Sequence, residues 1–110
     1  MAGPRMTLPT QLVLRQLMQD PTREMYGLEI CAAAGLPSGT IHPILARLEK
    51  VGWLESRWEE VDPAAEGRPK RRYYRLHPDG IAQVKAALHR AEASVAALGR
   101  LRPGLAGGAG

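Results

Sequence analysis

The segment 38–54 constrains the fold of this chain most, because its residues describe a helix with two unlike faces. One face is an apolar stripe with the three-and-four spacing of a helix, made of Ile41, Ile44, Leu45 and Leu48. Burying each of these side chains is worth roughly 1.5–3 kcal/mol, so this face is expected to pack on a core. The other face holds small, hydrogen-bonding and cationic side chains, namely Thr40, His42, Pro43, Ala46, Arg47 and Lys50. Such a face is suited to a polyanion.

Both ends of this helix are marked in the sequence. Gly52 supplies the left-handed conformation that ends a helix, and Ser38 or Thr40 can cap the first free N–H groups. Pro43 lacks an N–H and would cost about 3 kcal/mol in a helix interior, but little in the first turn. The pattern therefore predicts a regular helix that begins near Thr40 and has Pro43 in its first turn.

The size and charge of the chain narrow the classes of protein to consider. Its 110 residues are enough for one small domain and too few for two. Lys and Arg number 15 against 11 Asp and Glu, and the resulting net charge of +4 suits a nucleic-acid partner. A single cysteine, Cys31, excludes an internal disulfide, and no apolar run is long enough to span a membrane. We therefore expect a cytoplasmic protein with no membrane partner.

The segments around this helix predict a winged helix-turn-helix. Residues 1–6 suggest a loose arm, 8–19 a first helix, and 26–34 a short second helix closed by Gly35. Two helices joined by a glycine-containing turn, the second with one apolar and one polar face, form a helix-turn-helix. Residues 53–59 and 71–76 are β-prone runs, and the turn-rich stretch between them is expected to be irregular. These two runs predict a β-hairpin with a long tip, or wing, in a mainly α fold.

A long helix is expected to follow over residues 78–101. Its apolar residues form a heptad seam, the pattern of a helix that pairs with another: Ile81, Val84, Leu88, Ala91, Val95 and Leu98. Because Leu88, Val95 and Leu98 would be exposed in a monomer, the seam predicts a homodimer. Residues 102–110 are too poor in core-forming side chains to fold, so they are expected to be a flexible tail. The chain is therefore predicted to consist of a winged helix-turn-helix DNA-binding domain at residues 1–77, a dimerisation helix at 78–101 and this tail.

The predicted wing carries a dense positive charge. Five cations fall within eight residues with no acid among them: Arg68, Lys70, Arg71, Arg72 and Arg75. Such a run can be a solvated strand edge, but beside a helix-turn-helix it favours contact with DNA phosphates. Acidic residues lie nearby at Glu59, Glu60, Asp62 and Glu66. They would partly offset the positive charge and could hold the wing in the free protein.

Three blocks of the sequence resemble, in order and spacing, the signature of the PadR-like winged-helix transcriptional regulators. They are residues 25–30 (MYGLEI), 38–49 (SGTIHPILARLE) and 67–76 (GRPKRRYYRL), and the resemblance covers about residues 12–98. It implies a homodimeric repressor whose recognition helix and wing bind operator DNA, and the short single C-terminal helix resembles the compact subgroup. In that family a tyrosine is usual where this chain has His42, and a threonine where it has His77.

The expected DNA contacts lie on the polar face of the recognition helix and on the wing: Ser38, Thr40, His42, Pro43, Arg47, Arg68, Lys70 and Arg71. No nucleophile motif, phosphate-cradling glycine loop or short-spaced pair of metal ligands is present, so we predict neither an enzyme nor a metal or cofactor. Two alternatives stay open, a metal-responsive winged-helix repressor and a winged-helix module that binds protein. Release of a palindromic operator by a small-molecule effector also fits, although the sequence identifies no such molecule.

Overall fold

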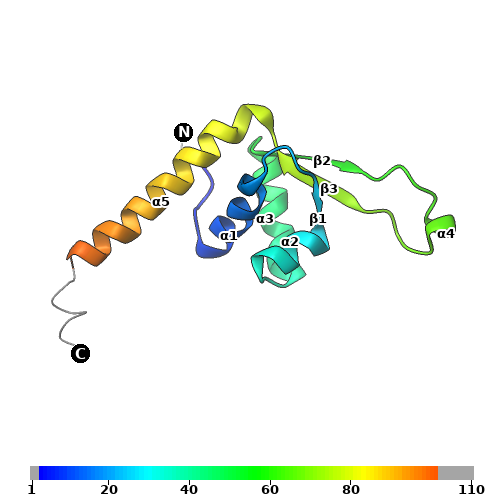
Figure 1. Cartoon of the computed structure of the whole chain (residues 1–110), viewed down its shortest axis with the longest axis horizontal. Helices are drawn as coiled ribbons and strands as arrows, with labels where there is room; N and C mark the ends of the chain where they lie inside the picture. The colour runs from blue at the N-terminus through cyan, green and yellow to red at the C-terminus, as the bar shows by residue number, and fades with distance from the viewer. Residues whose placement is uncertain (1–2, 102–110) are drawn as a thin grey trace.

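The computed structural model describes residues 3–101. Its elements are α1 (Leu8–Gln19), β1 (Met25–Tyr26), α2 (Gly27–Ala34), α3 (Ser38–Lys50), β2 (Leu54–Trp58), α4 (Pro63–Glu66), β3 (Arg72–Leu76), η1 (Pro78–Gly80) and α5 (Ile81–Leu101). Figure 1 shows α1, α2 and α3 gathered at the centre, with the β2–β3 hairpin extending to one side and α5 to the other. This is the predicted winged helix-turn-helix, mainly α with a long C-terminal helix. The tail expected at 102–110 lies outside the described residues.

The helix-turn-helix consists of α2 and α3. α2 begins at Gly27 rather than Tyr26, because Tyr26 and Met25 form a two-residue strand that pairs with β3. A strand this short shows no alternation of polar and apolar residues, so the sequence pattern did not reveal it. α2 ends as predicted at Gly35, whose φ of 69° is the left-handed conformation that glycine adopts without strain.

α3 begins at Ser38, two residues before the predicted start, and Pro43 therefore lies in its second turn rather than its first. Pro37 occupies the N-cap position, and its carbonyl accepts a hydrogen bond from the Thr40 N–H at 3.0 Å. The cap is thus made by backbone, and neither predicted hydroxyl side chain provides it. Pro43 leaves the carbonyl of Gly39 without its usual donor four residues on, but Gly39 is exposed, so water can hydrate that carbonyl.

The turn after α3 joins this helix to α5. Gly52 has the predicted positive φ, 83°, and the Trp53 N–H donates to the Leu48 carbonyl at 3.0 Å. Gly80, just before α5, lies against the same turn, where a Cβ would be 3.0 Å from the Trp53 Cα and 3.1 Å from the Gly52 carbonyl oxygen. The Trp53 indole N–H also donates to Gln83 Oε1 on α5 at 2.8 Å. The start of α5 is therefore seated on the end of α3.

The wing, residues 54–76, is built on a three-stranded antiparallel sheet with the order β1-β3-β2. Leu54 pairs with Leu76, Ser56 with Tyr74 and Trp58 with Arg72, so these six side chains share one face of the hairpin. Near α3 that face is buried, whereas Trp58 toward the tip is exposed. The same face thus changes from core to solvent-facing groove along the hairpin.

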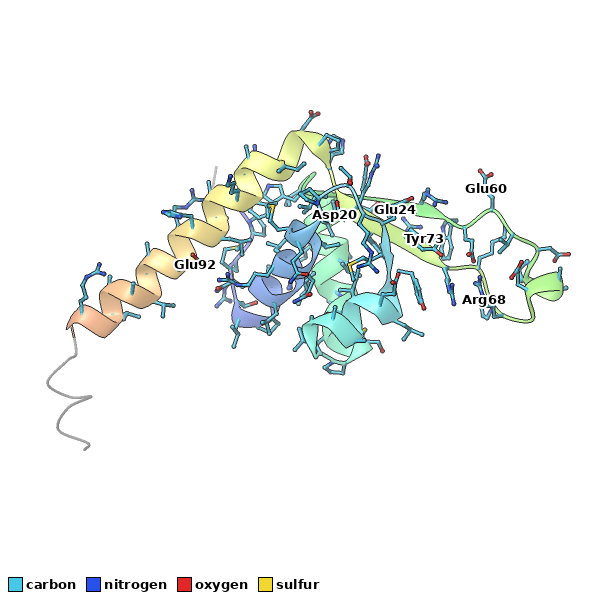
Figure 2. The ribbon with its side chains drawn as sticks, viewed as in Figure 1. Asp20, Glu24, Glu60, Arg68, Tyr73 and Glu92 are labelled. Atoms are coloured by element: carbon cyan, nitrogen blue, oxygen red, sulfur yellow. The ribbon has the colours of Figure 1, made fainter. Side chains whose placement is uncertain are left out.

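The tip of the wing contains one helical turn, α4, where an irregular loop was expected. Asp62 caps this turn by accepting from the Ala64 N–H at 3.0 Å, and Gly67, with a φ of 69°, ends it. Local side-chain capping therefore ordered a stretch whose composition indicated only turns. Figure 2 shows Glu60 and Arg68 on this outer part of the wing, away from the helices.

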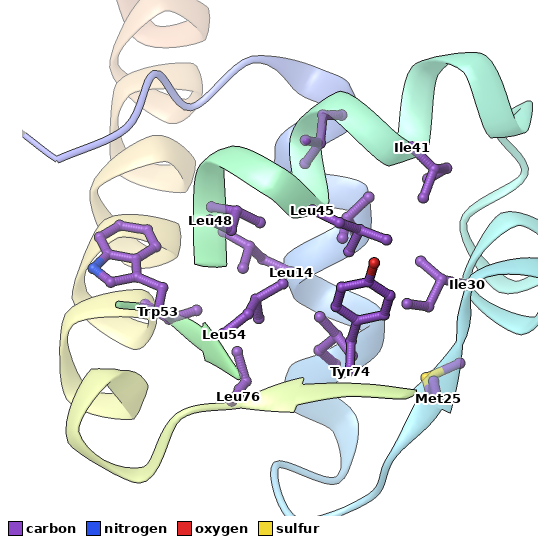
Figure 3. Close-up of a cluster of buried hydrophobic side chains, with 14 of the residues drawn as sticks. Leu14, Met25, Ile30, Ile41, Leu45, Leu48, Trp53, Leu54, Tyr74 and Leu76 are labelled. Carbon is purple, nitrogen blue, oxygen red and sulfur yellow. The ribbon is translucent and has the colours of Figure 1, made fainter. Parts of the chain in front are cut away.

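The core lies between the three N-terminal helices, the sheet and the start of α5. Nine large side chains are almost fully buried: Val13, Leu14, Leu17, Ile30, Ile41, Leu45, Leu48, Leu76 and Val84. Figure 3 shows Leu45 and Leu48 of α3, Leu14 of α1 and Tyr74 of β3 gathered in one cluster. The whole predicted stripe of α3 is buried, and this fixes the opposite face of α3 outward.

α5 packs on the core only through its first half. Leu88 is 7% exposed and lies beside Met18 of α1, so the prediction that Leu88 would be exposed in a monomer is wrong. An ion pair at 2.6 Å between Arg15 of α1 and Glu92 of α5 closes this contact. Farther along, Val95 and Leu98 remain 66% and 58% exposed. The predicted seam is therefore divided: Val84 and Leu88 are buried in the protomer, Ile81 and Ala91 are partly buried, and the last two positions face solvent.

The described part of the N-terminal arm is attached to the fold rather than loose. The Gln11 side-chain amide donates to the Met6 carbonyl at 2.7 Å, and the Met6 side chain packs against the core. A Cβ on Gly3 would be 3.2 Å from the Trp53 ring, so the arm also runs beside that tryptophan. Its attachment depends on residues far along the chain, which a local pattern does not reveal.

Candidate nucleic-acid interface

The outward face of α3 presents most of the residues predicted to read DNA. His42, Pro43 and Arg47 are exposed, Ser38 is exposed at the first residue of the helix, and Thr40 is half-buried. Within residues 3–101, Arg47 makes no ion pair. The side chains able to contact bases are thus held by a helix whose other face is locked in the core.

A groove of about 410 Å³ joins this face to the wing. Its lining residues come from α2, α3 and the wing, and no acidic side chain is among them. The ring and cationic side chains in it are Tyr26, His42, Trp58, Arg68, Lys70, Arg71, Arg72 and Tyr74. His42 fits there because position 27 is glycine: a Cβ at Gly27 would be 3.2 Å from the His42 ring. Helix α3 and the wing therefore share one basic concave surface.

Acids outside the run compensate three of the five wing cations, namely Arg68, Arg72 and Arg75. Arg75 pairs with Glu55, its cross-strand partner on β2. Arg72 lies 3.6 Å from Glu49 of α3, and its guanidinium is 5.1 Å from the Trp58 ring centroid. The five cations are adjacent in the sequence, but in the fold some are neutralised by acids and others are not.

Glu49 has a part in the site that sequence reasoning missed. Its carboxylate accepts from the Ser56 hydroxyl of β2 at 2.7 Å and is the partner of Arg72 on β3. One side chain thus ties the end of α3 to both strands of the wing, and this sets the position of the wing relative to the helix. The partners are distant in the sequence, so only the fold brings them together.

Lys70 and Arg71 are the wing cations that remain available. Neither makes an ion pair in the part of the chain that the structure describes. The Arg71 guanidinium lies 4.1 Å from the Tyr26 ring centroid, a cation–π contact that holds its direction and leaves its charge uncompensated. Tyr26 in turn meets Tyr73 edge to face, with ring centroids 5.8 Å apart. Aromatic rings thus support Arg71 at the groove.

Arg68, by contrast, is bonded within the wing. Its Nη1 and Nη2 donate to Oε1 and Oε2 of Glu59 at 2.7 and 3.1 Å, a bidentate pair whose side chains are 29% and 13% exposed. Glu59 also accepts from the Arg71 N–H at 3.2 Å and the Tyr73 hydroxyl at 3.4 Å. The hydrogen bond from Arg68 is the main cause that lowers the pKa of Glu59 to about 2, so Glu59 is ionised at neutral pH.

The structure also bears on two other kinds of site, a metal site and a membrane-spanning segment. Within residues 3–101, no three His, Cys, Asp or Glu side chains are grouped so that they could hold a metal ion. In that same range, no helix combines the length and the apolar character needed to cross a membrane. The basic groove between α3 and the wing is therefore the surface that we take as the candidate site.

Known proteins of this architecture include DNA-bound ones. A PadR family transcription regulator from Clostridium difficile R20291 is 20% identical, with a TM-score of 0.62, over 90% of this chain and 98% of its own. Reduced AbfR bound to DNA is 26% identical, with a TM-score of 0.61, over 81% of this chain and 58% of its own. A MepR mutant from S. aureus is 20% identical, with a TM-score of 0.59, over 73% and 54% of the two chains.

This chain spans only a little over half the length of AbfR and MepR. No curated protein sequence matches it. The family model described as "Transcriptional regulator PadR-like family" matches residues 13–86, which reach from α1 into α5 and contain the whole basic groove. The chain therefore belongs to the PadR-like family, a family of transcriptional regulators rather than enzymes.

Proposed function

We propose that this chain is a homodimeric repressor that places α3 in the major groove of a palindromic operator and holds the flanking phosphates with the wing. The observation that supports this most is the acid-free groove shared by α3 and the wing. A surface that combines an exposed polar helix face with uncompensated cations is complementary to duplex DNA. Family membership and the DNA-bound structure of AbfR point the same way.

In this proposal α3 reads the sequence. Arg47 is exposed in the last turn of α3 and can donate two hydrogen bonds to O6 and N7 of a guanine. Such a bidentate contact discriminates against a wrong base by about 1–3 kcal/mol. His42 and Thr40, about one and a half and two turns nearer the helix start, would contact other base edges, and Ser38 would meet phosphate at the N-terminus of the helix.

The wing supplies affinity in the same proposal. Lys70 and Arg71 are cations beside the groove that no acid neutralises in residues 3–101, so a phosphate gains their full charge. Phosphate contacts of this kind fix register and orientation but do not distinguish one sequence from another. The two surfaces would thus divide recognition between them, with α3 selecting the site and the wing holding it.

The dimer is proposed from the second half of α5. Val95 and Leu98 project from a helix that has left the core, in a stretch that also contains four alanines. A second copy of α5 would cover them, and the two-fold axis of such a pair would place two α3 helices on two half-sites. A palindromic operator follows from that symmetry.

Selection of bound sequences from a random duplex pool tests the proposal. The wild-type protein should enrich a palindrome, and Arg47→Ala should enrich the same sequence with one position per half-site relaxed. Lys85→Ala, which removes an exposed cation of α5 away from the groove, is the matched control and should select the wild-type sequence. Recovery of unenriched pool by the wild-type protein would contradict sequence-specific binding, and enrichment of a single half-site would contradict the dimer.

A further inference from the structure

The wing tip contains one ion pair that changes which cations can reach DNA. We propose that Glu59 is a built-in counter-anion that keeps Arg68 from DNA phosphates, so that the wing grips DNA through Lys70 and Arg71. This inference rests on the proposed DNA-binding function and concerns how the wing performs it. It assigns opposite roles to Arg68 and Lys70, two cations that the sequence placed together.

The geometry of the pair favours its survival in a complex. Arg68 already uses both terminal nitrogens on one carboxylate, so a phosphate would replace one bidentate anion by another and gain little. Departure of Arg68 would also leave the carboxylate of Glu59, which is only 13% exposed, without its strongest partner. The exchange is therefore unfavourable even though Arg68 lines the groove.

Glu59 is held in place by more than Arg68. The Arg71 N–H and the Tyr73 hydroxyl donate to its carboxylate, and its own N–H donates to the Arg71 carbonyl at 2.8 Å. These bonds connect the start of the tip loop to its end. A carboxylate fixed on both strands cannot swing away to release Arg68 without opening the loop.

The charge around Arg68 also disfavours a phosphate. Glu60, Asp62 and Glu66 are exposed on the outer part of the wing, and Glu66 lies 4.0 Å from Arg68. A phosphate near Arg68 would approach these carboxylates, whereas Lys70 makes no ion pair with an acid within residues 3–101. Like-charge repulsion therefore favours a phosphate at Lys70 over a phosphate at Arg68.

The slope of log binding constant against log salt concentration tests the assignment, because each phosphate contact adds about 0.9 to its steepness. With a fixed scrambled duplex, Lys70→Gln should reduce the slope by about 0.9 per bound protomer, which is about 1.8 for a dimer that loses both contacts, and Arg68→Gln should leave it unchanged. Glu59→Gln keeps the shape of the side chain but frees the charge of Arg68, so it should steepen the slope by up to about 0.9 per bound protomer. The double variant Glu59→Gln/Arg68→Gln should return to the wild-type slope.

If Arg68→Gln reduced the slope as much as Lys70→Gln does, Arg68 would be a phosphate contact and the inference would be overturned. If Glu59→Gln weakened binding with no change in slope, Glu59 would be only a loop brace, which also overturns it. A wild-type protein without salt-dependent binding of any duplex would overturn the proposed function itself. The comparison of Arg68→Gln with Lys70→Gln shows whether Arg68 contacts a phosphate even if Glu59→Gln does not fold.

Discussion

Substitution of Val95 by aspartate should separate assembly from folding. Val95 and Leu98 are 66% and 58% exposed, so neither contributes much to the protomer. Full burial of such a side chain is worth about 1.5–3 kcal/mol, which leaves roughly 1–2 kcal/mol for each to gain on assembly. The four side chains of a symmetric dimer then contribute about 4–8 kcal/mol, equivalent to a dissociation constant about 10³-fold to 10⁶-fold lower.

Val95→Asp places a charge in that contact and should give a folded monomer. Ala93→Asp is the matched control, because it adds the same charge two residues earlier, on the opposite face of α5, and should remain dimeric. Leu88→Glu should behave differently from both, since it puts a charge at a side chain buried in the protomer and should unfold the chain. Light scattering gives the mass and circular dichroism the fold. A dimeric Val95→Asp variant, or an equally monomeric Ala93→Asp variant, would refute this seam.

Two further predictions concern the fold and the wing. Gly80→Ala should destabilise the protein by about 1–3 kcal/mol in urea denaturation, because its Cβ would press on backbone atoms, whereas Gly99→Ala has open space and should stabilise α5 by about 0.5–1 kcal/mol. Glu59 has its pKa lowered from 4.5 to about 2, so its pairing stabilises the wing above pH 4.5 and is lost as the pH falls through 2. The melting temperature of Glu59→Gln should accordingly lie below that of the wild type at neutral pH and converge with it near pH 2; a constant difference at all pH values would contradict this.

Periodicity predicted most of the fold because burial of one face dictates it. The bounds of α1 match the prediction, and the buried stripe of α3 fixed the outward direction of Arg47 and His42. The predictions failed where partners distant in sequence decide. Met25 and Tyr26 form a strand because β3 pairs with them, and Leu88 is buried because α1 covers it. Neither fact has a local signal.

The sequence predicted where the candidate site lies, but not which of its cations are free to contact DNA. Charge density located the wing, since a run of cations is visible in a linear sequence. Which of those cations are paired with acids and which stay available for DNA depends on the residues that face them in the fold. Arg75 meets Glu55 across the hairpin, and Arg68 meets Glu59 only because the tip loop folds back. Pairing across a long loop requires the register of the strands, and the sequence alone does not supply it.

The division of recognition between α3 and the wing is tested most directly by titrating one selected operator duplex and one scrambled duplex with Arg47→Ala and Lys70→Ala. Arg47→Ala should lower the ratio of the two affinities by about 5-fold to 150-fold for each half-site, the equivalent of about 1–3 kcal/mol per lost contact, and leave scrambled binding nearly unchanged. Lys70→Ala should weaken both duplexes about equally and preserve the ratio. If Arg47→Ala weakened both duplexes in parallel and Lys70→Ala abolished the ratio of the two affinities, the proposal that α3 selects the sequence and the wing supplies affinity would be contradicted.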